Sequence, residues 1–224
     1  MPAWPLALAC WLLPTLLVIG CFMLSVHLDL IEGCFPFTDG CTSISRACRK
    51  EPVIHLFRSV MLPTATLLAV QWLVVGSWLR QLGEGGRSRM WIVFLGVTGA
   101  LFAILYGVFL GTDGPAYNLM RRYGVTVYFG FTALGELLLS ARLWKLSAPL
   151  RDRIGTGLAG GMVAMAAGML GLGLANVWFA NYLDNDVAEN VIEWWFALLM
   201  HGYFGLLAVA WYRWGLQIEA RSPA

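Results

Sequence analysis

Two ionisable side chains, Glu136 and His201, lie well inside long apolar runs of this 224-residue chain, and the amide Gln71 lies inside a third. A charged group in hydrocarbon costs about 2.5–3.5 kcal/mol on insertion scales, so such residues are candidate functional sites. A carboxylate and an imidazole whose side chains meet can act as general acid and base. Glu136 can equally be protonated or hydrogen bonded to a neighbouring helix, so catalytic and structural interpretations both stay open.

A second group of polar residues lies nearer one end of the apolar runs. His55 and Arg58 are three residues apart, which places them on one helical face. Guanidinium groups at this depth suit bidentate binding of phosphate or carboxylate. We expect a polar cavity in the outer leaflet that receives a lipid head group, although snorkelling and internal Arg–Glu pairs would also explain these residues. The predicted ligand-binding residues are His55, Arg58, Arg121, Arg122, Asn176 and Glu193.

Motifs for metal, nucleotide or covalent chemistry are missing from the sequence. The three histidines never occur at the His-x3-His or His-Glu-x-x-His spacing that zinc sites use. There is no phosphate-binding loop, dinucleotide fingerprint or G-x-S-x-G elbow. The sequence therefore predicts neither a metal site nor a bound cofactor.

The only long polar stretch, residues 34–58, contains three of the five cysteines, Cys34, Cys41 and Cys48. In an oxidising compartment three cysteines in one loop allow one disulfide and one spare thiol. Spacings of seven residues make Cys34–Cys41 and Cys41–Cys48 both plausible, and three unpaired thiols are the alternative. We expect Cys10 and Cys21, which lie in the first apolar run, to behave as small buried hydrophobic residues.

The elements that must position these residues are transmembrane helices. Hydrophobic residues make up 59% of the chain and charged residues 12%, about half the charge of a soluble domain. Apolar runs of this length cross about 30 Å of hydrocarbon as helices. The predicted fold class is an all-α polytopic membrane bundle that forms one domain, residues 1–224. The six expected spans are 4–26, 52–79, 90–111, 123–141, 155–178 and 190–214.

The distribution of basic residues predicts the orientation, because cytoplasmic loops carry an excess of Lys and Arg. Nine of the 15 basic residues fall in the second loop, the fourth loop and the C-terminal tail, and six fall on the other side. Both termini are therefore expected in the cytoplasm, and the loop at about 27–51 outside or in a lumen. We expect the protein in a plasma membrane, a bacterial-type inner membrane or an endomembrane.

Small residues form two seams that favour close helix packing. The net charge of +2 and the absence of a basic run argue against nucleic acid as a partner. Membrane lipids are the expected partners, and a membrane-protein partner could bind through a seam. The seams consist of Gly96, Ala100, Ala103, Gly107 and Gly111 in the third span, and of Gly157, Gly161, Ala164, Gly168, Gly171 and Ala175 in the fifth.

Short motifs resemble the damage-regulated autophagy modulator family, whose relatives include proteins that remodel GPI-anchor lipids. The motifs are Thr42-Ser43-Ile44-Ser45, Pro52, Leu56-Phe57-Arg58, Arg121-Arg122-Tyr123-Gly124 and Tyr128-Phe129. The resemblance implies six helices, a lumenal loop and an association with lipids. It implies no agreed catalytic residues, and the three loop cysteines and the paired arginines depart from the family pattern.

The leading hypothesis is a membrane protein that binds lipids, or helps to remodel or distribute them, through a polar outer-leaflet cavity. Arg58, Arg121 and Arg122 would contact an anionic or glycosylated head group. The first alternative is an intramembrane lipid-modifying enzyme, an acyl or head-group transferase or hydrolase, that uses Glu136 and His201. The second is a non-catalytic accessory subunit or scaffold in a membrane complex.

Overall fold

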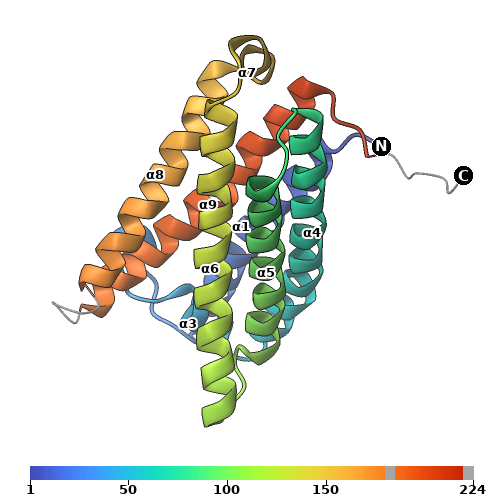
Figure 1. The fold of residues 1–224 in the computed structure, drawn as a ribbon. Coiled ribbons are helices and arrows are strands. Elements are labelled where there is room, and N and C mark those ends of the chain that lie inside the picture. Colours follow the sequence, from blue (N-terminus) through green and yellow to red (C-terminus); the bar gives the residue numbers. More distant parts are fainter. Residues whose placement is uncertain (180–184, 219–224) are drawn as a thin grey trace, which may run out of the picture.

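Six long helices build the molecule (Figure 1). The structure is a computed structural model, and it describes residues 1–179 and 185–218. Each long helix is long and apolar enough to cross a membrane, which confirms the predicted all-α, multi-pass class. Apart from one bridge between Pro2 and Gln217, the described residues form no β-structure. The long helices are α1 (Trp4–His27), α4 (Val53–Gln81), α5 (Arg87–Phe109), α6 (Pro115–Trp144), α8 (Thr156–Trp178) and α9 (Asp186–Trp214).

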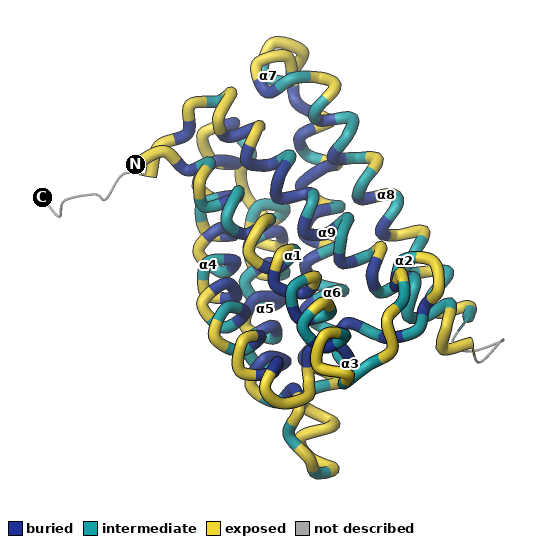
Figure 2. Tube along the Cα trace, turned by 180° about the vertical axis from the view of Figure 1, so that it is seen from behind, coloured by how far each residue is buried: buried dark blue, intermediate teal, exposed yellow. Residues whose placement is uncertain are grey.

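The long helices form a closed ring in the order α1, α4, α5, α6, α8 and α9, in which α9 packs back against α1. Large side chains fill its interior. Trp72 of α4 reaches across to α9, where its ring lies 6.2 Å from that of Phe204, and Trp78 lies 6.3 Å from Trp211. Figure 2 shows that the buried residues lie on the inward-facing sides of the helices, where the helices pack against one another.

Small residues let the helices approach closely around Trp72. A Cβ atom added to Gly96 of α5 would collide with the Trp72 ring, and one added to Gly135 of α6 would lie 3.0 Å from it. The predicted seam in the third span therefore packs inside the bundle. The seam in α8 is divided, because Gly161 and Gly168 approach leucines of α9 whereas Gly157 and Gly171 are exposed. Binding of a partner protein to this exposed part stays a prediction.

Helices α6 and α9 begin at least four residues earlier than the apolar pattern predicted. α6 begins at Pro115 rather than Tyr123, because proline suits the first turn of a helix and the polar residues that follow are compatible with helix outside the hydrocarbon. This end of α6 extends beyond its neighbours (Figure 1). α9 begins at Asp186 rather than Asn190, where the Asn185 side chain accepts a hydrogen bond from the Ala188 N–H. The apolar pattern therefore predicts which part of a helix lies in the hydrocarbon, but it does not predict where the helix begins.

Both termini lie at one end of the ring, which we call the termini end. The Ala3 N–H donates to the Leu216 carbonyl at 3.0 Å, and the Met1 carbonyl accepts from the Ile218 N–H at 2.7 Å. The turn between α4 and α5 and the short helix α7 (Ala148–Ile154) lie at the same end (Figure 1). The connection 28–52 covers the opposite end, which we call the loop end. Two further short helices, α2 (Pro36–Asp39) and α3 (Ile44–Cys48), belong to it.

A disulfide joins Cys34 to Cys41, the first of the two predicted pairings, and closes a small loop around α2. Cys48 is buried, and its thiol hydrogen bonds with that of Cys21 in α1. This hydrogen bond and burial raise the pKa of Cys48 well above its usual range, so the thiol stays protonated at neutral pH. Cys21 is therefore buried as expected, but it also has a polar partner.

Hydrogen bonds hold the connection 28–52 against the helix ends, so we call it the lid (Figure 2). The indole N–H groups of Trp194 and Trp195 donate to the carbonyls of Thr42 (2.9 Å) and Phe37 (3.0 Å). The Ser25 hydroxyl donates to the Ala47 carbonyl at 2.6 Å. These bonds place the polar residues of the lid over the ring at fixed positions.

Local features shape the lid around α2. Gly40 has φ +58° and lies against the backbone of Val187, so a side chain there would be strained and would collide with α9. Asp39 accepts from the Phe35 N–H at 2.8 Å and from the Thr38 hydroxyl at 2.8 Å, and these bonds lower the pKa of Asp39. The carboxylate thus stays charged to a lower pH than a free aspartate.

Candidate functional site

A cleft of about 580 Å³ lies at the loop end between α6 and α8. We call it the lateral cleft. Residues of α9 line its inner side, and residues at the start of α3 line its lid side. Figure 1 shows α6 and α8 close together near α7 and farther apart toward the loop end, with α9 visible between them. Small-molecule sites in proteins have volumes of about 300–1,000 Å³, so the lateral cleft is large enough for a lipid head group and part of a chain.

The lateral cleft is polar near the lid and apolar along its walls. Ser43 and Ser45 of the lid lie over it, and Asn176 lies at its side. The walls are apolar along α6, α8 and α9, where Phe129 and Phe196 stand with their ring centres 5.5 Å apart. Within residues 1–179 and 185–218, no lysine or arginine lines the cleft. This arrangement suits a ligand with a hydroxylated or amine-bearing head and an apolar tail.

Glu193 connects the lateral cleft to the lid. Its carboxylate accepts hydrogen bonds from the backbone N–H groups of Ile44 and Ser45 at the start of α3. The Asn190 side chain donates to the Gly40 carbonyl at 2.8 Å. Asn176 and Glu193 are thus the two predicted ligand-binding residues that the structure brings together. No hydrogen bond is found for the Asn176 amide within residues 1–179 and 185–218, which leaves it available to a ligand.

The predicted basic residues do not line the lateral cleft. Arg121 lines a separate cavity of about 490 Å³, the basic pocket, together with Arg49 and Lys50 of the lid and Asp113. This pocket lies at the turn between α5 and α6. The sequence predicted one polar cavity with these arginines. The described residues instead form two cavities, one lined by basic residues and one that none of them lines.

Arg58 is engaged by the end of α5. Its guanidinium donates to the carbonyls of Val108 (3.1 Å) and Leu110 (2.8 Å) and to the Thr112 hydroxyl (3.2 Å). The last carbonyls of a helix have no partner within the helix, and a cation there is favourable. Arg58 thus holds the end of α5, which leaves less of its guanidinium for a lipid phosphate.

His55 and Arg122 lie on the surface. His55 is exposed and stands 4.0 Å from Glu51, one helical turn earlier, and Arg122 is exposed on the part of α6 that extends beyond the bundle. The spacing of His55 and Arg58 does put them on one side of α4, but only Arg58 is turned far enough inward to meet α5. Neither His55 nor Arg122 lines the lateral cleft or the basic pocket.

Polar side chains also meet in the middle of the bundle. The Tyr128 hydroxyl and His201 Nε2 lie 3.1 Å apart, and the hydroxyls of Ser140 and Tyr203 lie 2.9 Å apart. A void of about 20 Å³, enough for one water molecule, is lined by Tyr128, His201 and Glu193. Glu193 and Phe129 line both this void and the lateral cleft, so they lie between the cleft and the inner polar group.

The side chains of Glu136 and His201 form no hydrogen bond with each other. The Glu136 carboxylate is fully buried and both oxygens lack a hydrogen-bond partner among the described residues, as do both polar atoms of the Gln71 amide. The Tyr203 hydroxyl bonds to the Glu136 backbone carbonyl (3.1 Å), not to its side chain. His201 takes Tyr128 as its partner. The two catalytic candidates thus form no direct pair, and Glu136 lines neither the lateral cleft nor the inner void.

Sequence reasoning missed the residues that surround the predicted ones. Ser43, Ser45, Glu189 and Asn190 line the lateral cleft, and Tyr128 is the partner of His201. Polar residues at the lid and at the start of the sixth span were a usable signal, because they lie at the same depth as Asn176 and Glu193. The tyrosines gave no signal, since tyrosine is also common at membrane interfaces.

Comparison with protein-family models, with curated proteins and with solved structures gave no match. The description of the protein therefore rests on its own sequence and structure. The chain is a multi-pass helical membrane protein with a disulfide-closed lid, a lateral cleft beneath that lid and a separate basic pocket.

Proposed function

We propose that the protein binds a membrane lipid through the lateral cleft, in the leaflet at the loop end, and so helps to remodel or distribute lipids. The observation that carries the proposal is a cleft with two parts. Ser43, Ser45 and Asn176 supply hydrogen-bonding groups beneath the lid, and aromatic and aliphatic side chains form its walls. A lipid has the same division between head and chain.

The residues that line the lateral cleft favour a glycosylated lipid head group over an anionic one. The carboxylate of Glu189 lines the lateral cleft, and no lysine or arginine among the described residues lines it, so a phosphate or carboxylate head would meet like charge without a basic partner. Hydroxyl and amide groups pair well with sugar hydroxyls. Of the anionic and glycosylated lipids considered from the sequence, the glycosylated class fits this cleft. The lid motifs also resemble the damage-regulated autophagy modulator family, whose relatives include proteins that remodel GPI-anchor lipids. This resemblance supports a lipid ligand in general, and we include kinship with that family in the proposal.

The position of the cleft also supports lipid rather than a soluble ligand. It lies between two membrane-spanning helices, and Val177 on its rim is exposed to the surroundings of the bundle. A lipid reaches such a cleft by lateral diffusion without leaving the bilayer. Its chain would lie against Phe129 and Phe196, and the head group would lie under α3.

The test fills the lateral cleft with one substitution. Gly173 lines it, and a Cβ there would be in ordinary contact with Phe196, at 3.8 Å, so Gly173→Leu directs a larger side chain into the cleft. We expect native mass spectrometry of the purified protein to show a loss of co-purified glycolipid of about tenfold or more, the loss that about 1.4 kcal/mol of binding free energy produces. Asn176→Leu, which removes a head-group partner, is expected to lower retention as well.

Gly171→Leu is the matched control. It adds the same side chain two residues away on the same helix, where a Cβ would meet no atom within 4 Å. This variant should retain as much lipid as the wild type. Equal glycolipid retention in the Gly173→Leu and Gly171→Leu proteins, both folded and monodisperse, would contradict the proposal.

A further inference from the structure

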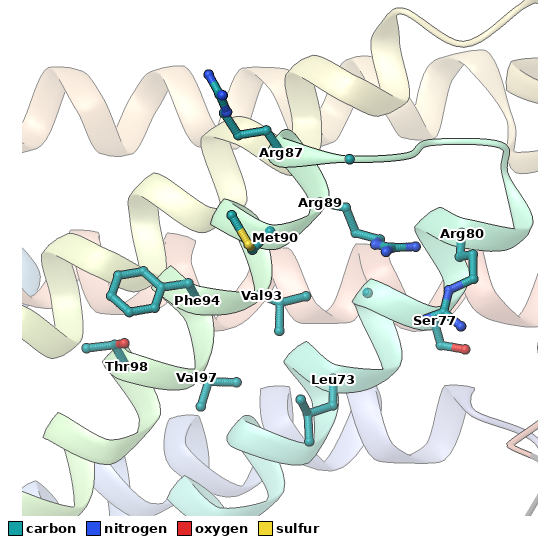
Figure 3. Close-up of a pocket in the computed structure, with 12 residues that line it drawn as sticks. Leu73, Ser77, Arg80, Arg87, Arg89, Met90, Val93, Phe94, Val97 and Thr98 are labelled. Atoms are coloured by element: carbon teal, nitrogen blue, oxygen red, sulfur yellow. The ribbon is translucent and has the colours of Figure 1, made fainter.

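A second groove, far from the lateral cleft, lies at the termini end between α4 and α5 (Figure 3). It has a volume of about 830 Å³. At its floor the two helices pack closely, because residue 76 is glycine, where a Cβ would lie 2.5 Å from a methyl carbon of Val93. We call it the arginine groove. Its lining is Leu73, Gly76, Ser77, Arg80, Gly86, Arg87, Arg89, Met90, Val93, Phe94, Val97 and Thr98.

The lining changes from apolar to basic along the groove. Leu73, Phe94 and Val97 form the part nearer the middle of the bundle, and Leu73 and Phe94 are more than half exposed. Arg80 in the last turn of α4 and Arg89 in the first turn of α5 stand at the other end. Figure 3 shows the Arg89 side chain extending toward Arg80 and Ser77, while Arg87 extends away from them.

The positive charge of this groove is not neutralised within the protein. No hydrogen bond or ion pair engages the guanidinium groups of Arg80, Arg87 and Arg89 within residues 1–179 and 185–218. The one acidic residue in the α4–α5 turn, Glu84, stands 3.8 Å from Arg142 of α6. Arg80 and Arg89 therefore face the groove without a partner among the described residues, whereas Arg87 extends away from it.

The start of α5 adds to the attraction for an anion. Its N-cap is Gly86, which has no side chain to accept a hydrogen bond from the first N–H groups of the helix. Free N–H groups and the positive end of the helix dipole favour a negative group at this position. This backbone contribution acts together with Arg89, which lies on the same turn.

We propose that the arginine groove binds an anionic phospholipid from the leaflet at the termini end. The phosphate lies between Arg80 and Arg89, and an acyl chain lies along Leu73, Phe94 and Val97. Charge complementarity selects the anionic class, since guanidinium groups match phosphate geometry. The exposed apolar wall selects a lipid over free phosphate, because a small ion would leave that wall uncovered.

The site is independent of the function proposed above. The lateral cleft lies between α6, α8 and α9 at the loop end, whereas the arginine groove lies between α4 and α5 at the termini end. The two cavities share no residue and differ in charge. The protein would thus hold lipids of different head-group chemistry in its two leaflets.

The experiment measures lipid binding by the full-length protein in nanodiscs. Phosphatidylglycerol is titrated into phosphatidylcholine discs, and lipid bound to the ejected protein is counted by native mass spectrometry. Arg80→Gln and Arg89→Gln should each weaken phosphatidylglycerol binding about fivefold, the effect of one basic residue near a membrane surface. The double variant should lose more binding than either single variant, and because both arginines contact the same phosphate the two effects are not expected to be independent. Binding of phosphatidylcholine should not change.

Two further variants separate the possible occupants. Val97→Trp fills the apolar part and leaves all arginines in place, so it should also reduce phosphatidylglycerol binding. Lys145→Gln removes one positive charge at an exposed position of the same end, outside the groove, and should have no effect. Inorganic phosphate at millimolar concentration should not displace the lipid.

Three outcomes would overturn the proposal. The first is equal loss in Arg89→Gln and Lys145→Gln, which would show general surface charge. The second is full binding by Val97→Trp, or displacement by inorganic phosphate, which would show a site for a free anion. The third is unchanged phosphatidylglycerol binding in the double variant. Gly173→Leu should keep its phosphatidylglycerol, so failure of the glycolipid proposal and failure of this one are distinguishable.

Discussion

At the residue scale, single side chains decide whether a polar group is structural or available to a ligand. Arg58 was a predicted lipid contact, yet three hydrogen bonds engage it at the end of α5. Arg89 was not singled out, yet it has no hydrogen-bond or ion-pair partner among the described residues and lines a partly apolar groove. The difference lies in whether a carbonyl of a neighbouring helix is within reach.

Trp72 illustrates how one residue determines the packing of four helices. It comes from α4, lies against glycines of α5 and α6, and reaches Phe204 of α9. In hydrocarbon no hydrophobic effect drives helices together, so close packing around such a side chain has to hold the ring.

We expect Gly96→Ala to destabilise the bundle by about 1–3 kcal/mol, the usual cost of adding a methyl group to a packed core. The added Cβ would collide with the Trp72 ring. Thermal unfolding in detergent, followed by fluorescence, measures the change. Gly171→Ala is the control, because it adds the same methyl group at an exposed position. Equal midpoints for the two variants would show that the contact with Trp72 tolerates the methyl group.

At the element scale, the lid is a preformed cover. Helices α2 and α3 are too short to be stable alone, and their hydrogen bonds to the tryptophans of α9 and to Ser25 of α1 hold them in place. The Cys34–Cys41 disulfide limits the freedom of the chain around α2 when these bonds open.

Replacing both members of this disulfide, Cys34→Ser with Cys41→Ser, should loosen the lid. A loop of this length is worth about 2–3 kcal/mol in the chain-entropy account. We expect faster amide hydrogen exchange across residues 35–42 and unchanged exchange in the middle of α4 and α9. Cys10→Ser, which alters a buried residue of α1 outside the lid, serves as the control. Unchanged exchange across 35–42 in the double variant would mean that the hydrogen bonds to α9 suffice.

At the scale of the whole molecule, the two ends of the ring differ in charge and in covering. The termini end carries the arginines of the α4–α5 turn and of α7, and the loop end carries the lid and its disulfide. The excess of basic residues predicts that the termini end faces the cytoplasm. A disulfide at the other end agrees with that orientation, because disulfides persist in oxidising compartments.

Introduced cysteines can test this orientation. Glu32 is exposed at the loop end, and Gly85 lies in the α4–α5 turn, where a side chain would meet no atom within 4 Å. On intact cells, a membrane-impermeant maleimide should label Glu32→Cys, and should label Gly85→Cys only after permeabilisation. The native chain, whose other cysteines are buried or paired, is the blank. The reverse pattern would place the lid in the cytoplasm.

The sequence by itself determined what depends on composition and on distance along a helix. Apolar length and the shortage of charge fixed the class and all six spans, and the rise per residue placed Asn176 and Glu193 at matching depth. For the loop cysteines it left two plausible disulfide pairings and three unpaired thiols as the alternatives. Helix ends were missed where a polar helix continues beyond the hydrocarbon, as at Pro115.

Only the tertiary structure decided which polar groups meet. Depth is readable from sequence, but the side of a helix that meets a given neighbour depends on the packing of all six helices at once. His201 therefore meets Tyr128 rather than Glu136, and Arg58 meets the end of α5. For the same reason Arg80 and Arg89, from two different helices, face one groove.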